Sequence, residues 1–233
     1  MRPIPIQHAL ESDTELVDPQ PISHSLANPL ANPFAACRIR PGALAYRFPP
    51  IESLDACLER IVSHRRCQIV GPHGIGKSTL VHTLLTAWIR RGGRADWFRV
   101  GPAGALDRIA LSAERMSSLL PSERDGQRKV SAEMHLVCVD GWDRLSRWRR
   151  LTQLLALRGA YCVITTHHAT RWPVLHRPAP TPELLQELAD ELQSATPISM
   201  RVPPATIEAC YRRCDGNLRE SLFALYDEFE DRR

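Results

Sequence analysis

The stretch that most constrains this chain is CQIVGPHGIGKSTLVHTLL, residues 67–85. Gly71, Gly76, Lys77 and Ser78 match the pattern G-x-x-x-x-G-K-[ST], with an apolar run before it and a helical pattern after it. Glycines let a loop wrap closely around phosphate oxygens, because no side chain blocks the backbone N–H groups. The helix N-terminus that follows adds partial positive charge. The stretch therefore predicts a phosphate-binding loop and not a simple strand–helix turn.

We expect Lys77 to reach the β- and γ-phosphates of a nucleotide and the Ser78 hydroxyl to ligate Mg²⁺. Of 30 lysines and arginines only Lys77 and Lys129 are lysines, which makes a lysine at this position informative. The residues expected to line the phosphate site are Gly71, Pro72, His73, Gly74, Ile75, Gly76, Lys77, Ser78 and Thr79.

Short apolar runs alternate with helical patterns over most of the chain. The runs are continuously apolar, which is typical of a parallel sheet covered on both faces. We expect a doubly wound α/β fold with a five-stranded parallel sheet. The predicted strands are 67–70, 95–100, 135–140, 161–165 and 198–202, and the predicted helices are 51–66, 77–91, 106–120, 144–158, 182–193, 205–215 and 217–230.

Three regions follow from this pattern. Residues 1–34 are rich in Pro, Ser, Asn and acidic residues and are predicted to be a flexible tail. Residues 35–202 form the predicted nucleotide-binding core. Residues 203–233 form a predicted short helical lid, in which Leu218, Leu222, Leu225 and Phe229 make one apolar stripe.

Asp140 ends the apolar strand HLVCVD, where its carboxylate is expected to face Mg²⁺ beside Ser78. A strand-ending Asp that caps a turn is the alternative. Gly141 follows where many ATPases carry a glutamate that acts on the attacking water. We expect Asp143 to orient this water instead, although it could also cap the helix that starts near Arg144.

These motifs resemble the additional-strand class of P-loop ATPases. VDGWDRL is similar to the DGxDE variant of the NACHT and wider STAND switch ATPases, with Arg144 where those carry a further acid. The resemblance implies that strand 161–165 lies between the strands of residues 67–70 and 135–140. The end of this strand would then point at the γ-phosphate, and the pleat decides whether Thr165, Thr166 or His167 faces it. We assign Thr166 to this role, like the sensor 1 of AAA+ proteins.

GNLRESL resembles the sensor 2 motif of AAA+ lids, which implies that Arg219 reaches the γ-phosphate. A solvated arginine is the alternative. Together the resemblances imply an ATP- and Mg²⁺-dependent ATPase that acts as a nucleotide switch, with Lys77, Asp140, Asp143, Thr166 and Arg219 as catalytic residues. Two alternatives stay open: a nucleotide-dependent binding module with negligible hydrolysis, and a small-molecule or nucleoside kinase.

The sequence constrains partners weakly. A net charge of +4 permits an acidic partner without requiring one. The predicted apolar face of helix 144–158 consists of Leu145, Trp148, Leu151 and Leu155. The arginines of this helix are expected to form its solvent-exposed face, and the alternative is a basic stripe that binds nucleic acid phosphates. A protein partner or a homo-oligomer is a further expectation, in which Arg171 or Arg177 could act as an arginine finger.

Composition and cysteine usage indicate the setting. The chain is 43% hydrophobic and 24% charged, which is ordinary for a globular protein. It shows no signal peptide and no apolar run of membrane-spanning length, so we expect a cytoplasmic protein with seven free thiols and no membrane contact. Cys210 and Cys214 could ligate a metal, but no second pair with suitable spacing is near.

Overall fold

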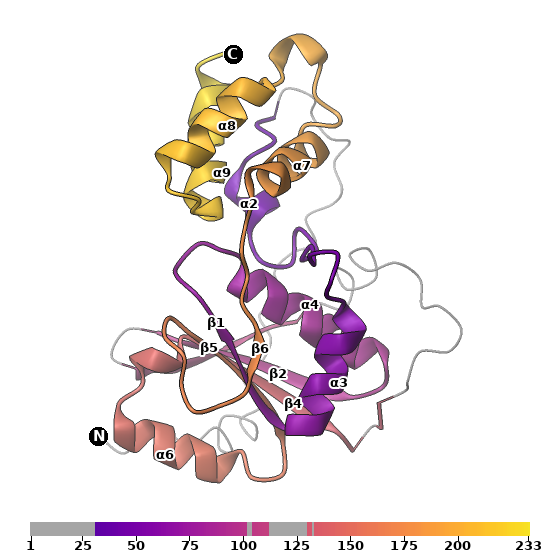
Figure 1. Ribbon diagram of the computed structural model, residues 1–233, viewed down its shortest axis with the longest axis vertical. Coiled ribbons are helices and arrows are strands. Elements are labelled where there is room, and N and C mark those ends of the chain that lie inside the picture. The colour runs from indigo at the N-terminus through magenta and orange to yellow at the C-terminus, as the bar shows by residue number, and fades with distance from the viewer. Residues whose placement is uncertain (1–30, 102–103, 112–129, 132) are drawn as a thin grey trace.

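The computed structural model describes residues 31–101, 104–111, 130–131 and 133–233 (Figure 1). They form an α/β fold around a six-stranded, mostly parallel sheet with the order β3-β2-β4-β5-β1-β6. The strands are β1 (Arg66–Val70), β2 (Arg94–Val100), β3 (Leu106–Ile109), β4 (His135–Asp140), β5 (Tyr161–Thr166) and β6 (Val174–His176). β5 pairs with both β1 and β4, which confirms the predicted position of this strand between the other two.

Two parts of the predicted sheet were wrong. Residues 198–202 do not form a strand: Ile198–Met200 is a 3₁₀ helix, and Ile198 is 84% exposed. The fifth parallel strand is β6, which pairs with β1. Leu106–Ile109, predicted to start a helix, is the antiparallel edge strand β3 beside β2. The rest of that predicted helix, from residue 112, lies outside the described residues.

Helices cover both faces of the sheet (Figure 1). α3 (Leu54–His64) and α4 (Lys77–Arg90) pack with Ile69, Leu136 and Val163 on one face. On the other face the 3₁₀ turn η2 (Trp142–Arg144) and the residues flanking α6 (Arg147–Ala156) pack with alternate residues of β2, β4 and β5. Since successive strand residues point to opposite faces, this division fixes which side chains at the strand ends lie beside α4.

The predicted apolar face of α6 is mostly exposed. Leu145 is buried, but it precedes the helix, whereas Trp148, Leu151 and Leu155 are 80%, 49% and 48% exposed. The face turned to the protein carries Gln153, which is buried. The pattern correctly predicts an amphipathic helix, but its apolar stripe points away from the sheet.

The C-terminal helices gather at one end of the molecule, beyond the sheet (Figure 1). α7 (Pro182–Leu192), α8 (Pro204–Arg213) and α9 (Leu218–Glu230) share a core with the short helix α2 (Ala36–Ile39). The predicted stripe contributes to that core, with Leu222, Leu225 and Phe229 buried and Leu218 packed against them. Phe34 is also buried there against Phe229, while residues 1–30 of the predicted tail lie outside the described residues.

All seven cysteines are free thiols, as expected. Burial raises the pKa of several of them, to about 11 for Cys57 and Cys67 and about 12 for Cys162. These thiols therefore behave as small apolar core residues.

Candidate functional site

The glycine loop, residues 71–76, joins the end of β1 to the start of α4, as the sequence predicts. Gly74 and Gly76 have φ angles of 76° and 95°, a left-handed conformation that glycine adopts without strain. Gly76 directly precedes the helix, so the loop leads into the positive end of the α4 dipole. Ile75 is buried, and its side chain fills the space where a Cβ on Gly71 would lie.

Lys77 folds back over this loop. Its ammonium group donates to the carbonyl oxygen of Gly71 at 2.6 Å and also to that of Pro72. Burial lowers the pKa of Lys77, while Asp140 and Asp143 oppose that shift. A buried cation held at the mouth of a glycine loop is well placed to meet phosphate oxygens.

Ser78 and Asp140 meet across the site although 62 residues separate them in sequence. The Ser78 hydroxyl donates to Oδ2 of Asp140 at 2.7 Å, and the Thr165 hydroxyl donates to Oδ1 at 2.5 Å. Hydroxyl and carboxylate oxygens are hard ligands, which suit Mg²⁺. The donor set at this position therefore fits the predicted metal ion.

Thr165, and not the predicted Thr166, lies on the side of β5 that faces Asp140. Thr166 points to the opposite face of the sheet, where its hydroxyl lies 3.4 Å from Oε1 of Gln68. Gln68 also accepts from the Thr170 amide at 2.9 Å and so holds the segment after β5. The alternation of strand side chains explains the difference, because Thr165 shares its face with Val163 on the α4 side.

Arg99 is a site residue that the sequence did not reveal. It lies opposite Asp140 in the β2–β4 register, and its Nε is 3.8 Å from Oδ2 of Asp140. The signal that could have found it is the alternation along β2, since Trp97 and Arg99 share a face.

Asp143 is hydrogen-bonded to a histidine. It lies in η2, and its Oδ2 accepts from Nδ1 of His167, directly after β5. Burial alone would raise the pKa of Asp143, but the His167 hydrogen bond and the nearby Arg144 outweigh it, and the pKa lies below the usual range. The helix cap that was the alternative role for Asp143 belongs to Ser146, whose hydroxyl accepts from the Arg149 amide.

His167 also contacts the glycine loop. Its Nε2 lies 3.2 Å from Nδ1 of His73, and the ring centroids are 4.0 Å apart. Burial lowers the pKa of His73, and His167 and Lys77 lower it further, so the neutral ring is favoured. Asp143, His167 and His73 thus form a continuous chain from η2 to the loop.

The C-terminal helices touch the loop through backbone. The Arg219 amide donates to the Gly74 carbonyl at 3.1 Å, and a Cβ on Gly74 would lie 1.8 Å from the Asn217 side chain. Asn217 caps α9 by accepting from the Glu220 amide. The Arg219 guanidinium lies over the Phe223 ring, 5.4 Å from its centroid, so the structure brings the backbone of this predicted residue to the loop and leaves its side chain along α9.

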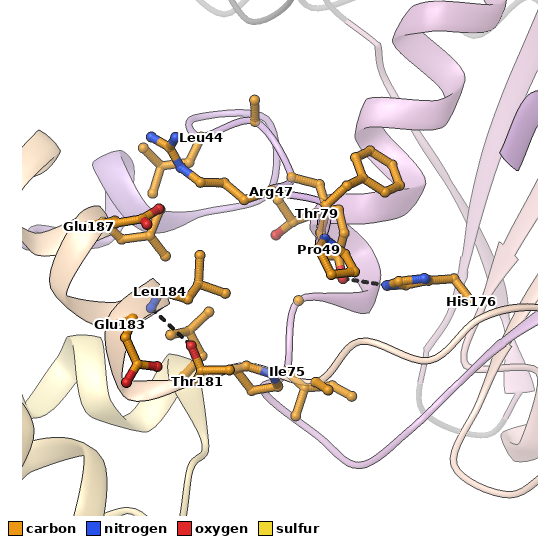
Figure 2. Close-up of a pocket in the computed structure, with 18 of the residues that line it drawn as sticks. Leu44, Arg47, Pro49, Ile75, Thr79, His176, Thr181, Glu183, Leu184 and Glu187 are labelled. Carbon is orange, nitrogen blue, oxygen red and sulfur yellow. Dashed lines mark hydrogen bonds between the residues drawn. The ribbon is translucent and has the colours of Figure 1, made fainter. Parts of the chain in front are cut away.

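A pocket of about 300 Å³ adjoins the glycine loop (Figure 2). Thr79 and Ile75 line it on the loop side, and Leu184 of α7 lines it on the opposite side. The segment before α3 supplies another wall that includes Tyr46, whose hydroxyl lies 2.7 Å from Nε2 of His176. The lining is mainly apolar with a few polar groups, which suits a planar organic ring.

Comparison with models of known protein families and with curated proteins finds no match. Within the described ranges, no group of three or more His, Cys, Asp or Glu residues could hold a metal ion. Cys210 and Cys214 therefore do not belong to such a group of metal ligands there. No helix in the described part of the chain is both long and apolar enough to cross a membrane.

Proposed function

We propose that this chain is a P-loop NTPase of the additional-strand class, which binds ATP with Mg²⁺ and hydrolyses it as an AAA+- or STAND-like switch. The observation that carries the proposal is the Ser78–Asp140 hydrogen bond of 2.7 Å. It joins the residue after the loop lysine to the end of a neighbouring buried strand. Two oxygen ligands from these positions, beside a glycine loop, are what a nucleotide-bound Mg²⁺ requires.

Each part of the site has a role in this proposal. Backbone N–H groups of the glycine loop and Lys77 hold the phosphates, and Ser78 and Asp140 would hold Mg²⁺ directly or through water. The ion supplies neutralisation of charge on the phosphate oxygens. Thr165 and Arg99 keep the Asp140 carboxylate turned toward Ser78.

The pocket of Figure 2 is the proposed site of the nucleobase and ribose. It begins at Thr79, the residue after Ser78, so a nucleotide with its phosphates on the loop can extend into it. Leu218 and Leu222 of α9 also line the pocket. A bound base would therefore contact both the sheet domain and the C-terminal helices, which supports a switch role.

The test is binding of labelled ATP with Mg²⁺ and release of phosphate by the purified chain. Lys77→Ala should weaken ATP binding by about 10- to 100-fold, because a charge-assisted hydrogen bond contributes about 1.5–3 kcal/mol. Lys129→Ala, which removes the other lysine, is the matched control and should bind as the wild type does. Equal binding by the wild type and Lys77→Ala would exclude the proposal.

A second reading is favoured by Gly141, which places no acid directly after Asp140. In that case bound ATP stabilises one conformation of the protein, and a partner recognises that conformation. Lys77-dependent binding without phosphate release above the Lys77→Ala background would support this binding module.

A further inference from the structure

The two carboxylates that act electrostatically on Lys77 both accept hydrogen bonds from other side chains. Asp140 accepts from Ser78 through one oxygen and from Thr165 through the other. Asp143 accepts from His167. Neither carboxylate is therefore placed to act alone on a water molecule above the loop.

The hydrogen bond to Asp143 determines which nitrogen of a neutral His167 ring carries the proton. The Asp143 carboxylate is ionised, so it can only accept, and Nδ1 of His167 must carry the proton in this pair. In the neutral imidazole, Nε2 is then the nitrogen with the lone pair. That atom points to the glycine loop, where His73 Nδ1 lies 3.2 Å away.

We propose that His167 is the general base of the ATPase and that Asp143 is its positioning residue. The inference rests on the proposed function above. Asp143 holds the ring in the tautomer that leaves Nε2 as an acceptor directed at the phosphate end of the loop. A water molecule that takes the place of His73 at Nε2 lies beside the loop that binds the γ-phosphate.

The reaction step balances without any further reactant. One O–H bond of the water breaks and its proton goes to Nε2 of His167. The water oxygen forms a bond to the γ-phosphorus, and the bond from that phosphorus to the bridging oxygen breaks. The bridging oxygen leaves with the electron pair as part of ADP, inorganic phosphate departs, and the imidazolium returns its proton to solvent.

This assignment differs from a role for Asp143 as the direct base, and the two make opposite predictions. If His167 is the base, its loss removes general-base catalysis, which contributes about 10²–10⁴-fold. Loss of Asp143 then has a smaller effect, because the histidine stays. If Asp143 acts directly, loss of Asp143 has the larger effect.

The experiment compares His167→Ala, Asp143→Asn, the double variant and His168→Ala, the neighbouring histidine, as the matched control. Single-turnover phosphate release gives the rate, and titration with fluorescent ATP gives the Kd. We expect His167→Ala to lower the rate at least about 10²-fold with a Kd within about threefold of the wild type. The double variant should be no slower than His167→Ala, because the two residues act as one unit.

A readout independent of activity is the tautomer of His167, measured by ¹⁵N NMR in the nucleotide-free protein. The wild type should show the proton on Nδ1, and Asp143→Asn should reduce that population. His167→Gln, which keeps a polar side chain, replaces His167→Ala if the latter does not fold.

Five results would overturn the proposal: a His167→Ala rate equal to the wild type, a larger loss in Asp143→Asn than in His167→Ala, additive losses in the double variant, a proton on Nε2 in the wild type, or ATP binding without any phosphate release. If ATP binding does not depend on Lys77, the proposed function itself is wrong. Failure of the proposed function is thus distinguishable from failure of the His167 assignment.

Discussion

Gly141 has a backbone conformation and a hydrogen bond that constrain, at the residue scale, which residue can follow Asp140. Its φ is 85°, and its amide donates to Thr165 Oγ1, the same hydroxyl that donates to Asp140. A residue with a side chain is strained in this left-handed conformation. The backbone at this position therefore favours glycine, where many ATPases carry a glutamate, and the next acid along the chain is Asp143 in η2.

We predict that Gly141→Ala lowers both stability and phosphate release. The strain should reduce the free energy of unfolding by about 1–2 kcal/mol. Displacement of the Gly141 amide should also loosen Thr165 and Asp140 and so lower the rate. Gly159→Ala is the matched control: its φ is 94°, and no atom lies within 4 Å of the added Cβ. It should show the same loss of stability in urea unfolding and a wild-type rate.

The same geometry predicts that Gly141→Glu does not restore a faster ATPase. The glutamate would be strained by the left-handed backbone at this position. A rate above the wild type in Gly141→Glu would show that backbone conformation is not what keeps the acid from this position.

At the scale of elements, the sequence predicted the buried strands well. The strands β1, β2, β4 and β5 are mostly buried, and their predicted bounds differ by at most one residue at each end. β6 was missed because a strand of three residues after a proline is too short to show a hydropathy pattern. β3 was missed because an edge strand with both Asp107 and Arg108 exposed satisfies a helical pattern equally well.

The exposed face of α6 illustrates a different limit. The spacing of Trp148, Leu151 and Leu155 defines an amphipathic helix, but it does not say which surface the helix meets. The structure places Trp142 and Leu145, just before the helix, in the core instead. A sequence pattern thus predicts the type of element more securely than its orientation.

We predict that the two tryptophans of this region differ sharply in their effect on stability. Trp142 is buried and lies 5.8 Å from Trp172, ring centroid to ring centroid, so Trp142→Ala should lower the free energy of unfolding by about 3–5 kcal/mol. Trp148→Ala should change it by no more than about 0.5 kcal/mol, because that ring is 80% exposed. Urea unfolding measures both, and a large loss in Trp148→Ala would contradict the orientation of α6.

At the scale of the whole molecule, the contact at Gly74 connects the glycine loop to the C-terminal helices. The Arg219 amide bonds to the loop, and the Asn217 side chain packs against Gly74 while it caps α9. The order of these elements in sequence predicts that a lid follows the core. It does not predict that the contact is made by backbone and by a capping residue, because both depend on tertiary placement.

We predict that this cap couples the stability of α9 to nucleotide affinity. Asn217→Ala removes the cap and should lower the free energy of unfolding by about 1 kcal/mol. Ser53→Ala removes the equivalent cap of α3, where the hydroxyl accepts from the Ala56 amide, and serves as the matched control. Both variants should lose similar stability in thermal unfolding, because each leaves one helix end without its capping acceptor.

Only Asn217→Ala should also weaken ATP binding, by about fivefold if the lost 1 kcal/mol is expressed in the Kd. The reason is that Leu218 and Leu222 of the same helix line the pocket proposed for the base. Fraying at the start of α9 therefore disturbs the loop contact and the pocket wall together. Equal Kd values in the two variants would mean that the C-terminal helices rest against the loop without responding to the nucleotide, and the switch role would then lose its structural basis.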